Sequence, residues 1–255
     1  MTTQNSQLTT HNFSAAHNSP TDYHCHLLPG VDDGAKSVEE SVEMARFLAT
    51  AGFQTVHCTP HLINGVYSAG SQAVRSGVEA LQGRLDREGI DLRLEPGREY
   101  YLDEFLLGNL DDPLLVGDTG LLLVEFSNQA TEDQVKSTLF RVVQKGFTPL
   151  IAHPERYRLL EPKEDKSKKG FWTSFFNSKL KTQNSQFPNA LLSYLQEIGC
   201  QFQGNLGSFA GLYGERVQRN AQRLQDMGLY SHYGTDGHSV KGLKASGIRE
   251  SRDNP

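Results

Sequence analysis

The sequence predicts an α/β fold built from repeated strand–helix units. One pattern recurs along the chain: an amphipathic stretch ends at a glycine, and a short apolar run follows at once. The glycines in this pattern are Gly52, Gly89, Gly146, Gly199 and Gly228. Glycine after the last turn of a helix supplies the left-handed C′ conformation, so each one marks a helix end that leads into a strand. Repeated units of this kind favour a parallel sheet, open or closed into a barrel.

Seven apolar runs are expected to be strands that alternate with helices. They lie near residues 21–25, 53–58, 91–95, 121–126, 147–152, 200–204 and 230–235. Histidines and carboxylates follow most of these runs, and the catalytic groups of α/β barrels gather at the carboxyl ends of the strands. This arrangement favours a closed barrel over an open sheet. The length of 255 residues suits a single domain of this type.

Two helix starts are expected from capping boxes. Ser37 precedes Glu40 by three positions, and Thr131 precedes Gln134 by three positions. The apolar residues that share one helical face are Val38, Val42, Ala45 and Ala49 after the first start, and Val135, Leu139 and Val142 after the second.

Two segments do not fit this alternation of strands and helices. Residues 1–20 are polar and lack an apolar core, so we expect a disordered leader rather than a secretory signal. Residues at about 161–188 hold six lysines and are long for a plain connection. We expect an insertion on the catalytic face of one domain that spans residues 21–255. It is either a plain loop or a lid that recruits an acidic phosphopeptide or a kinase tail.

Composition and charge exclude several functional classes. Twenty-five basic side chains against thirty acidic ones give a net charge of −5, which argues against a protein held to nucleic acid by phosphate contacts. No run approaches the ~18 apolar residues of a membrane-spanning helix, so no span is expected. The three cysteines form no even disulfide framework, which favours a reducing compartment and a cytoplasmic location. The sequence indicates no oligomeric state.

Histidines and carboxylates at the strand ends predict a multi-metal hydrolytic site. Along a strand, His24 and His26 project to the same side because alternate side chains share a face. Imidazole and carboxylate together form the ligand set of divalent transition metals. The further candidate ligands at or near strand ends are Asp33, His61, Glu99, Glu125, His153, Asp236 and His238.

The motifs around these residues resemble a known superfamily. The segments are the His-x-His-x-Leu-Pro-Gly-x-Asp-Asp-Gly-Ala start at residue 24, Thr-Pro-His at 59–61, Glu-Tyr-Tyr at 99–101, Glu-Phe at 125–126 and Ala-His-Pro-Glu-Arg at 152–156. Over roughly residues 21–240 the chain resembles the polymerase-and-histidinol-phosphatase (PHP) superfamily of metal-dependent phosphoesterases. The closer likeness is to its bacterial protein-tyrosine phosphatase branch, which is linked to capsular and exopolysaccharide synthesis.

The resemblance implies a distorted seven-stranded α/β barrel that holds up to three metal ions. By position, the implied first set is His24, His26, Glu99 and Asp236, the second is Glu99, Glu125 and His153, and the third is Asp33, His61 and His238. Manganese is typical of the branch, while the donor types also suit iron or zinc. The alignment favours Asp33 over Asp32 and leaves Asp32 as a charge at a helix start.

The implied catalytic residues are Arg156, Asp236 and His238. Arg156 is the candidate to clamp the phosphate, because a guanidinium group matches phosphate oxygens in two-point contacts. Asp22, two residues before the histidine pair, is expected to orient it. A cysteine-based phosphatase needs an arginine six residues after the nucleophile, and none of Cys25, Cys58 and Cys200 has one.

The implied activity is the dephosphorylation of phosphotyrosine, with the tyrosine-rich tail of a bacterial kinase that regulates polysaccharide synthesis as the client. Two alternatives stay open at this point. One is a phosphatase for a small molecule such as histidinol phosphate. The other is a metal-binding regulatory module with impaired catalysis, because only 17 residues follow His238 (255 minus 238), where relatives continue for several dozen. For the same reason we expect an incomplete C-terminal helical cover.

Overall fold

The computed structural model describes residues 21–117, 120–161 and 189–249. Their strands are β1 (Thr21–Cys25), β2 (Thr55–Cys58), β3 (His61–Leu62), β4 (Arg93–Pro96), β5 (Glu99–Tyr101), β6 (Leu121–Glu125), β7 (Thr148–Ala152), β8 (Gln201–Asn205) and β9 (His232–Gly234). Their helices are α2 (Val38–Thr50), α3 (Ser71–Arg87), α4 (Glu132–Gln144), α5 (Ala190–Glu197), α6 (Leu206–Phe209), α7 (Glu215–Asp226) and α8 (Val240–Ala245), with short 3-10 turns at Leu106–Leu110, Pro154–Arg156 and Arg158–Leu160.

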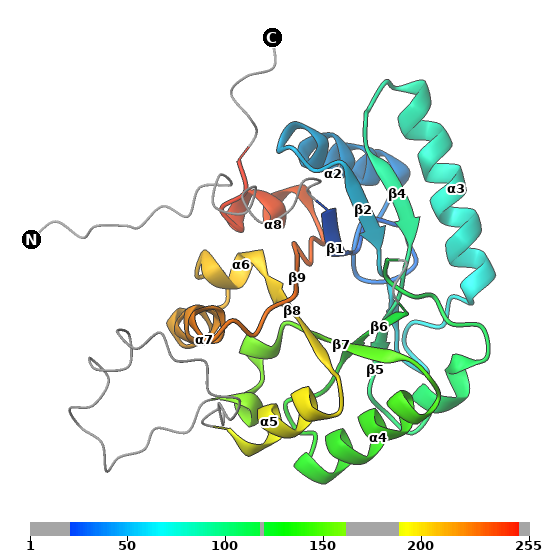
Figure 1. Ribbon diagram of the computed structural model, residues 1–255. Helices are drawn as coiled ribbons and strands as arrows, with labels where there is room; N and C mark the ends of the chain where they lie inside the picture. Colours follow the sequence, from blue (N-terminus) through cyan, green and yellow to red (C-terminus); the bar gives the residue numbers. More distant parts are fainter. Residues whose placement is uncertain (1–20, 118–119, 162–188, 250–255) are drawn as a thin grey trace, which may run out of the picture.

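All ladders between these strands are parallel, and the helices lie outside them (Figure 1). A three-stranded sheet has the order β1–β2–β4, and a six-stranded sheet has the order β3–β5–β6–β7–β8–β9. The two sheets meet where β1 lies beside the end of β9. There the His26 amide donates to the Gly237 carbonyl at 3.0 Å, and the Asp236 amide donates to the His24 carbonyl at 2.6 Å. The predicted α/β class with a parallel sheet is therefore confirmed.

A strand lies at each of the seven predicted positions, with ends shifted by at most two residues. The two short strands β3 and β5 were not predicted, so the described residues hold nine separate strands. Each follows a break in the preceding strand, at Pro60 and at Gly97. Proline lacks the N–H that a ladder needs. A Cβ at Gly97 would lie 2.9 Å from Cγ2 of Thr59, so the chains approach too closely there for a larger residue.

The helix ends follow the predicted chemistry closely. All five glycines of the recurring pattern have φ between +65° and +95°. Thr131 and Gln134 form the complete capping box. Ser37 caps the Glu40 amide, but the Glu40 carboxylate accepts from the Lys36 amide, so the predicted reciprocal box is wrong in its second half.

The central strands β6, β7 and β8 bury both of their faces over most of their length, as is usual for parallel sheets covered by helices. Leu121, Leu123 and Leu150 pack inside the curve of the sheet, in a cluster that Tyr23 borders. Alternate residues of the same strands, such as Leu122 and Ile151, pack against helices outside it.

The exposure of Val38 in α2 and the packing of α8 both bear on what the sequence predicted for the helices. Val38 was expected on the buried face of α2, yet it is 38% exposed because it lies in the first helical turn. At the C-terminal side, α8 packs near α2, and Leu243 and Ile248 are buried in the same core cluster. The predicted leader (1–20) and the insertion, apart from Glu161, lie outside the described residues.

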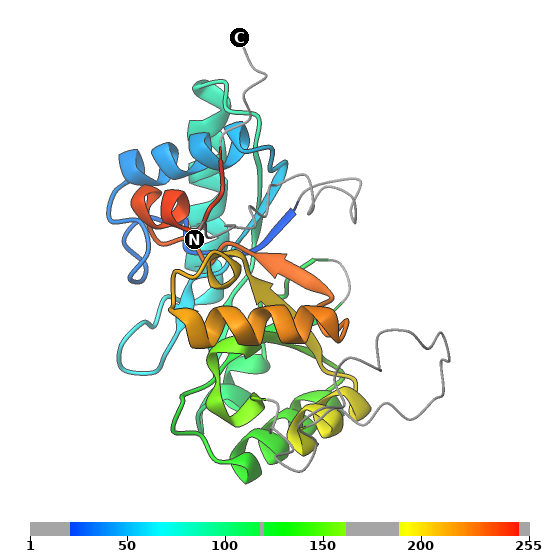
Figure 2. The same cartoon turned by 90° about the vertical axis from the view of Figure 1, so that its left-hand side faces the viewer.

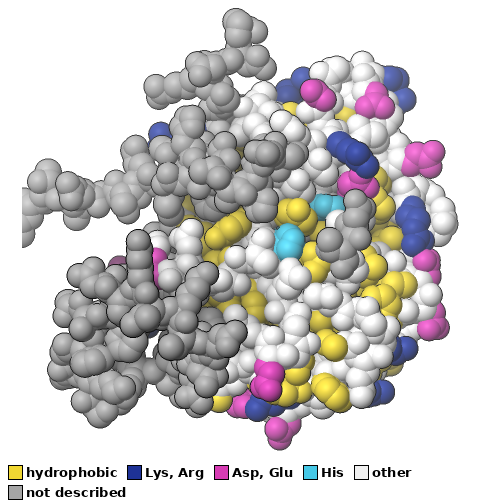
Figure 3. All heavy atoms as spheres, viewed as in Figure 1, with side chains coloured by type: hydrophobic (Ala, Val, Ile, Leu, Met, Phe, Trp, Pro, Cys, Tyr) yellow, Lys and Arg dark blue, Asp and Glu magenta, His cyan; other side chains and the backbone are white. Residues whose placement is uncertain are grey.

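The strands β8 and β9 run with their C-terminal ends to the left of Figure 2, where several connecting loops gather. The opposite end of the sheet faces the viewer in Figure 1. On that face, described charges of both signs are scattered around the periphery and hydrophobic side chains lie nearer the centre (Figure 3). No helix in the described ranges has the length and hydrophobicity needed to span a bilayer.

Candidate metal centre

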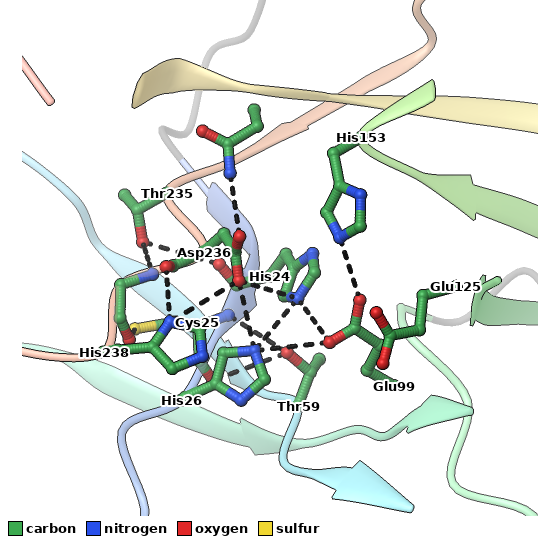
Figure 4. A network of polar contacts seen from close by, with 12 residues as sticks. His24, Cys25, His26, Thr59, Glu99, Glu125, His153, Thr235, Asp236 and His238 are labelled. Carbon is green, nitrogen blue, oxygen red and sulfur yellow. Dashed lines mark hydrogen bonds and ion pairs between the residues drawn. The ribbon is translucent and has the colours of Figure 1, made fainter. Parts of the chain in front are cut away.

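The end of β1 places two imidazoles against two carboxylates. The Nε2 atoms of His24 and His26 lie 3.1 Å apart, and both residues are fully buried. His24 Nε2 lies 3.1 Å from Glu99 Oε2 and 3.3 Å from Asp236 Oδ1. His26 Nε2 lies 3.4 Å and 3.2 Å from the same two oxygens. These four side chains, from β1, β5 and the segment after β9, converge on one point (Figure 4).

A second cluster shares Glu99 with the first. His61 Nδ1 lies 3.0 Å from Glu99 Oε2 and 3.0 Å from Glu125 Oε1. The other carboxylate oxygen of Glu99 lies 3.1 Å from His153 Nε2. The resemblance implied His153 as the third member of this set. In the structure His61, Glu99 and Glu125 present their ligand atoms within 4.8 Å of one another, and His153 contacts the group through Glu99.

A third cluster lies nearer the solvent and consists of His26, Asp33, His61 and His238. Asp33 Oδ1 lies 3.5 Å from His61 Nε2 and 3.4 Å from His238 Nε2. The Asp33 side chain is 49% exposed and that of His238 is 32% exposed. All nine candidate ligands from the sequence therefore lie in, or in contact with, three adjoining clusters, of which this one opens to solvent.

Gln203, which has no motif around it, orients the first histidine. Its Oε1 lies 3.0 Å from Nδ1 of His24, and the glutamine is fully buried on β8. Its role could not be found in the sequence, because the contact joins strands 179 positions apart.

Asp32 orients the second histidine. Its Oδ2 lies 2.7 Å from His26 Nδ1 and also accepts from the His61 amide. The interpretation of Asp32 as a helix-start charge is wrong, because Ser37 occupies the N-cap and Asp32 turns inward. Carboxylate–imidazole pairs of this kind are common behind metal-ligating histidines.

Two site residues have unusual backbone conformations. His153 has φ of 34° and Asp236 has φ of 51°, in the left-handed region that non-glycine residues rarely adopt. Asp22 secures the second of these turns, since its carboxylate accepts from the amides of His24 and Thr235 and from the Thr235 hydroxyl. It thus holds β1 and β9 together beneath the site, and such over-determined local strain is characteristic of functional sites.

Electrostatics in the first cluster favour charged forms despite complete burial. Burial alone would lower the pKa of His24 and His26, but the neighbouring carboxylates raise both overall. Burial would likewise raise the pKa of Glu99 and Asp236, yet nearby positive charges hold both well below the usual range. The positive charge that matters most for Asp236 is that of Arg156, whose Nη2 donates to Oδ2 at 2.5 Å.

The two outer histidines are shifted in opposite directions. Burial opposes protonation of His61, but hydrogen bonds to Glu125 and Glu99 raise its pKa to about 10. Burial and then the charge of Arg156 lower the pKa of His153 to about 4. Near pH 7 the imidazole of His153 is therefore neutral and can ligate a metal, while that of His61 is protonated in the metal-free protein.

The donor set fits divalent ions. Glu99 Oε2 is buried and makes no hydrogen bond of good geometry within the part of the chain that the structure describes, although three imidazole nitrogens lie 3.0 to 3.4 Å away. The imidazole nitrogens therefore lie around this oxygen as ligands lie around a shared ion, and not along the directions of hydrogen bonds. Nitrogen and carboxylate oxygen without sulfur suit manganese, iron or zinc.

Comparison with known proteins adds to this geometry. The family model for capsular polysaccharide synthesis proteins CpsB/CapC matches residues 20–170. Tyrosine-protein phosphatase YwqE of Bacillus subtilis (strain 168) is 33% identical over 226 residues, which are 86% of this chain and 78% of that protein. A putative tyrosine-protein phosphatase, CapC of Staphylococcus aureus, is 23% identical over 221 residues, covering 86% of this chain and 77% of its own length.

A solved structure is similar over most of the chain. It is one of the crystal structures of YwqE from Bacillus subtilis and CpsB from Streptococcus pneumoniae, which are described as metal-dependent tyrosine phosphatases. The TM-score is 0.73 at 31% sequence identity, over 89% of this chain and 84% of that one. The likeness predicted from the sequence motifs is confirmed, and the protein belongs to the CpsB/CapC family of capsular polysaccharide synthesis proteins.

Proposed function

We propose that this protein is a metal-dependent protein-tyrosine phosphatase. The observation that carries the proposal is the sharing of Glu99, His26 and His61 among three adjoining imidazole–carboxylate clusters. Linked clusters at the carboxyl ends of parallel strands are suited to phosphoester hydrolysis. The relatives named as tyrosine-protein phosphatases support phosphotyrosine as the substrate.

The proposed ligands are the nine residues expected from the sequence. His24, His26, Glu99 and Asp236 hold one ion, His61, Glu99 and Glu125 with His153 hold another, and Asp33, His238 and the shared histidines hold the third. Manganese is the proposed metal, with iron or zinc as substitutes. Ions bound there supply Lewis acidity toward phosphoryl oxygens and activate water at neutral pH.

Arg156 is the proposed phosphate clamp. Its guanidinium group lies at the edge of the first cluster and is held by Asp236 at 2.5 Å. Asp236 thus serves two groups at once, since its Oδ1 faces His24 and His26 while Oδ2 faces the arginine. A guanidinium fixed in this way presents its remaining N–H groups to an incoming phosphate. His238, at the opening, completes the proposed set of catalytic residues.

The cysteines do not suit nucleophilic catalysis. Cys25, Cys58 and Cys200 are all buried. Burial raises the pKa of Cys25 well above its usual value and raises that of Cys200 to about 12. Because the thiolate is the nucleophile, such groups are inert near pH 7.

The proposed architecture is the distorted seven-stranded barrel. If β2 with β3 and β4 with β5 are each one interrupted strand, the count becomes seven. Hydrogen bonds across the breaks support this, from the Gly97 amide to the Cys58 carbonyl and from the Glu99 amide to the Pro60 carbonyl. The contacts between β1 and the end of β9 close the circle. One barrel also supports the predicted single domain over residues 21–255.

The proposed client is the phosphorylated tail of a bacterial tyrosine kinase, acting in the cytoplasm. The family's connection with capsular polysaccharide synthesis supports this choice. The exposure of Asp33 and His238 at the mouth supports access by a protein substrate rather than only by a small molecule.

The deciding experiment compares hydrolysis of a phosphotyrosine peptide and of histidinol phosphate by manganese-loaded protein, with and without chelator. The proposal expects faster turnover of the peptide, lost on chelation and restored by metal. Preference for histidinol phosphate would favour a small-molecule phosphatase. Tight metal binding without hydrolysis of either compound, over a range of divalent ions, would favour a regulatory module.

A further inference from the structure

The guanidinium group of Arg156 is covered on one face by an aromatic ring. Its Cζ atom lies 3.8 Å from the centroid of the Tyr213 ring. At this distance the positive charge is attracted by the electrons of the ring face. The contact joins the turn after β7 to the loop between α6 and α7, 57 positions later (213 minus 156).

Tyr213 is itself held in place on the side of the metal centre. The side chain of Asn205, at the end of β8, and the Tyr213 ring both lie against Gly207. Gly207 allows the loop to approach, since a Cβ there would lie 3.3 Å from Cε2 of the tyrosine. Gly211 and Gly214, with φ of 83° and 87°, turn the chain on either side of the ring.

The same network reaches a proposed metal ligand. Asn205 Nδ2 donates to Asp236 Oδ2 at 3.0 Å, and Arg156 Nη2 donates to the same oxygen. Tyr213, Asn205, Arg156 and Asp236 therefore form one connected group. Displacement of the ring removes a constraint on the arginine that no other aromatic contact in the described residues replaces.

Stacking has a particular advantage for an anion-binding arginine. A hydrogen-bonding neighbour would occupy N–H donors, whereas a ring occupies only the face of the guanidinium. Of the Arg156 donors, Nη2 bonds to Asp236, and Nε is buried without a hydrogen-bond partner among the described residues. The stacked geometry fixes the plane of the group and keeps N–H donors for an incoming phosphate.

We propose that Tyr213 is a positioning residue, which holds the Arg156 guanidinium in the orientation that receives the phosphoryl group of the substrate. The proposal rests on the proposed function, because it assigns phosphate binding to Arg156. It adds a residue on the α6–α7 loop that acts through the arginine. Tyr213 is 38% exposed and the Arg156 side chain is 21% exposed, so solvent reaches both partners of the stack.

The test measures the affinity of manganese-loaded protein for inorganic phosphate by calorimetry. Tyr213→Leu keeps an apolar side chain and removes the ring, so it should weaken phosphate binding by roughly 3- to 30-fold. Tyr213→Phe keeps the ring and should stay within about twofold of the wild type. Metal content and Tm should be unchanged in both variants. If Tyr213→Leu folds poorly, Tyr213→Met supplies a second non-aromatic variant.

A double-mutant cycle separates positioning from general packing. In an Arg156→Ala background, Tyr213→Leu should cause no further loss of phosphate affinity, because the group it orients is gone. An equal loss in that background would overturn the proposal. So would wild-type affinity in both non-aromatic variants, a Tyr213→Phe defect as large as that of Tyr213→Leu, or a metal-loaded wild type that binds no phosphate.

The outcome is distinguishable from a failure of the proposed function. Protein that hydrolyses phosphotyrosine but shows no dependence of phosphate affinity on the Tyr213 ring contradicts only the positioning role. Protein that shows the full phosphate-binding pattern but hydrolyses no phosphotyrosine contradicts only the phosphatase assignment.

Discussion

The Oε1 atom of Gln203 lies 3.0 Å from Nδ1 of His24. An amide oxygen only accepts, and the amide nitrogen of Gln203 is engaged by the Gly204 carbonyl at 2.7 Å. The proton of the neutral imidazole is thereby held at Nδ1. The lone pair remains on Nε2, which faces Glu99 and Asp236. The glutamine thus selects the tautomer of His24 that can ligate a metal.

Removal of this acceptor should weaken metal binding. Gln203→Leu is expected to lower the manganese affinity by roughly 10- to 100-fold, as is typical when the partner of a ligating histidine is lost. Gln203→Glu retains an acceptor and should lose far less. Gln222→Leu on the exposed surface of α7 is the matched control. Titration calorimetry measures all three, and wild-type affinity in Gln203→Leu would refute the role.

Asp32 and Asp33 should respond differently to conversion to asparagine. Burial opposes ionisation of Asp32, but the hydrogen bond with His26 lowers its pKa to about 2. The folded-state pKa lies below the ordinary value of 3.8, so its stabilisation of about 2 kcal/mol is present above pH 4 and is lost as the pH falls toward 2. Asp32→Asn should therefore lower the free energy of unfolding of the metal-free protein by about that amount at pH 7.

The exposed neighbour Asp33 provides the contrast. Asp33→Asn should leave the free energy of unfolding of the metal-free protein within about 0.5 kcal/mol of the wild type. It should also reduce the number of bound ions by one, because it belongs only to the outer cluster. Urea unfolding and elemental analysis together check this pair. The assignment fails if Asp32→Asn is the silent variant and Asp33→Asn the unstable one.

Metal binding should release protons. The pKa of His61 is raised to about 10 in the metal-free protein, above its ordinary 6.5, so its ion pairs stabilise that form fully below pH 6.5 and are lost as the pH rises through 10. Metals require neutral imidazole. Manganese affinity should therefore increase from pH 6 to pH 9, with about one proton displaced from His61 and further protons displaced from His24 and His26, whose pKa values are also raised.

Calorimetry in buffers of different ionisation enthalpy measures this release. His61→Gln should reduce it by about one proton. A binding enthalpy independent of the buffer would show that these histidines are already neutral.

Gly234 should tolerate no side chain. A Cβ there would lie 2.6 Å from the Cβ of His24 and 2.8 Å from its amide nitrogen, so β9 would have to move away from β1. Gly234→Ala should reduce the free energy of unfolding by about 1–3 kcal/mol. Gly108→Ala, at a position with no atom within 4 Å, is the control and should change it little. Equal stabilities by denaturant unfolding would contradict the close approach of the strands.

The elements that sequence could predict are those determined locally. A glycine after a helix, a cap such as Thr131 and the alternation of His24 and His26 depend on neighbouring residues, and all are found where expected. Contacts set by strand register could not be predicted in this way. Gln203 contacts His24 and Tyr213 contacts Arg156, both far away in the chain. No neighbouring sequence motif indicates either contact.

Anomalous diffraction at the manganese absorption edge, from crystals grown with manganese, tests the central claim most directly. The account predicts anomalous peaks at the three clusters. The decisive peak is the one enclosed by His24, His26, Glu99 and Asp236. A map in which manganese occupies other positions, or none, while these four side chains lie together without an ion between them would contradict it.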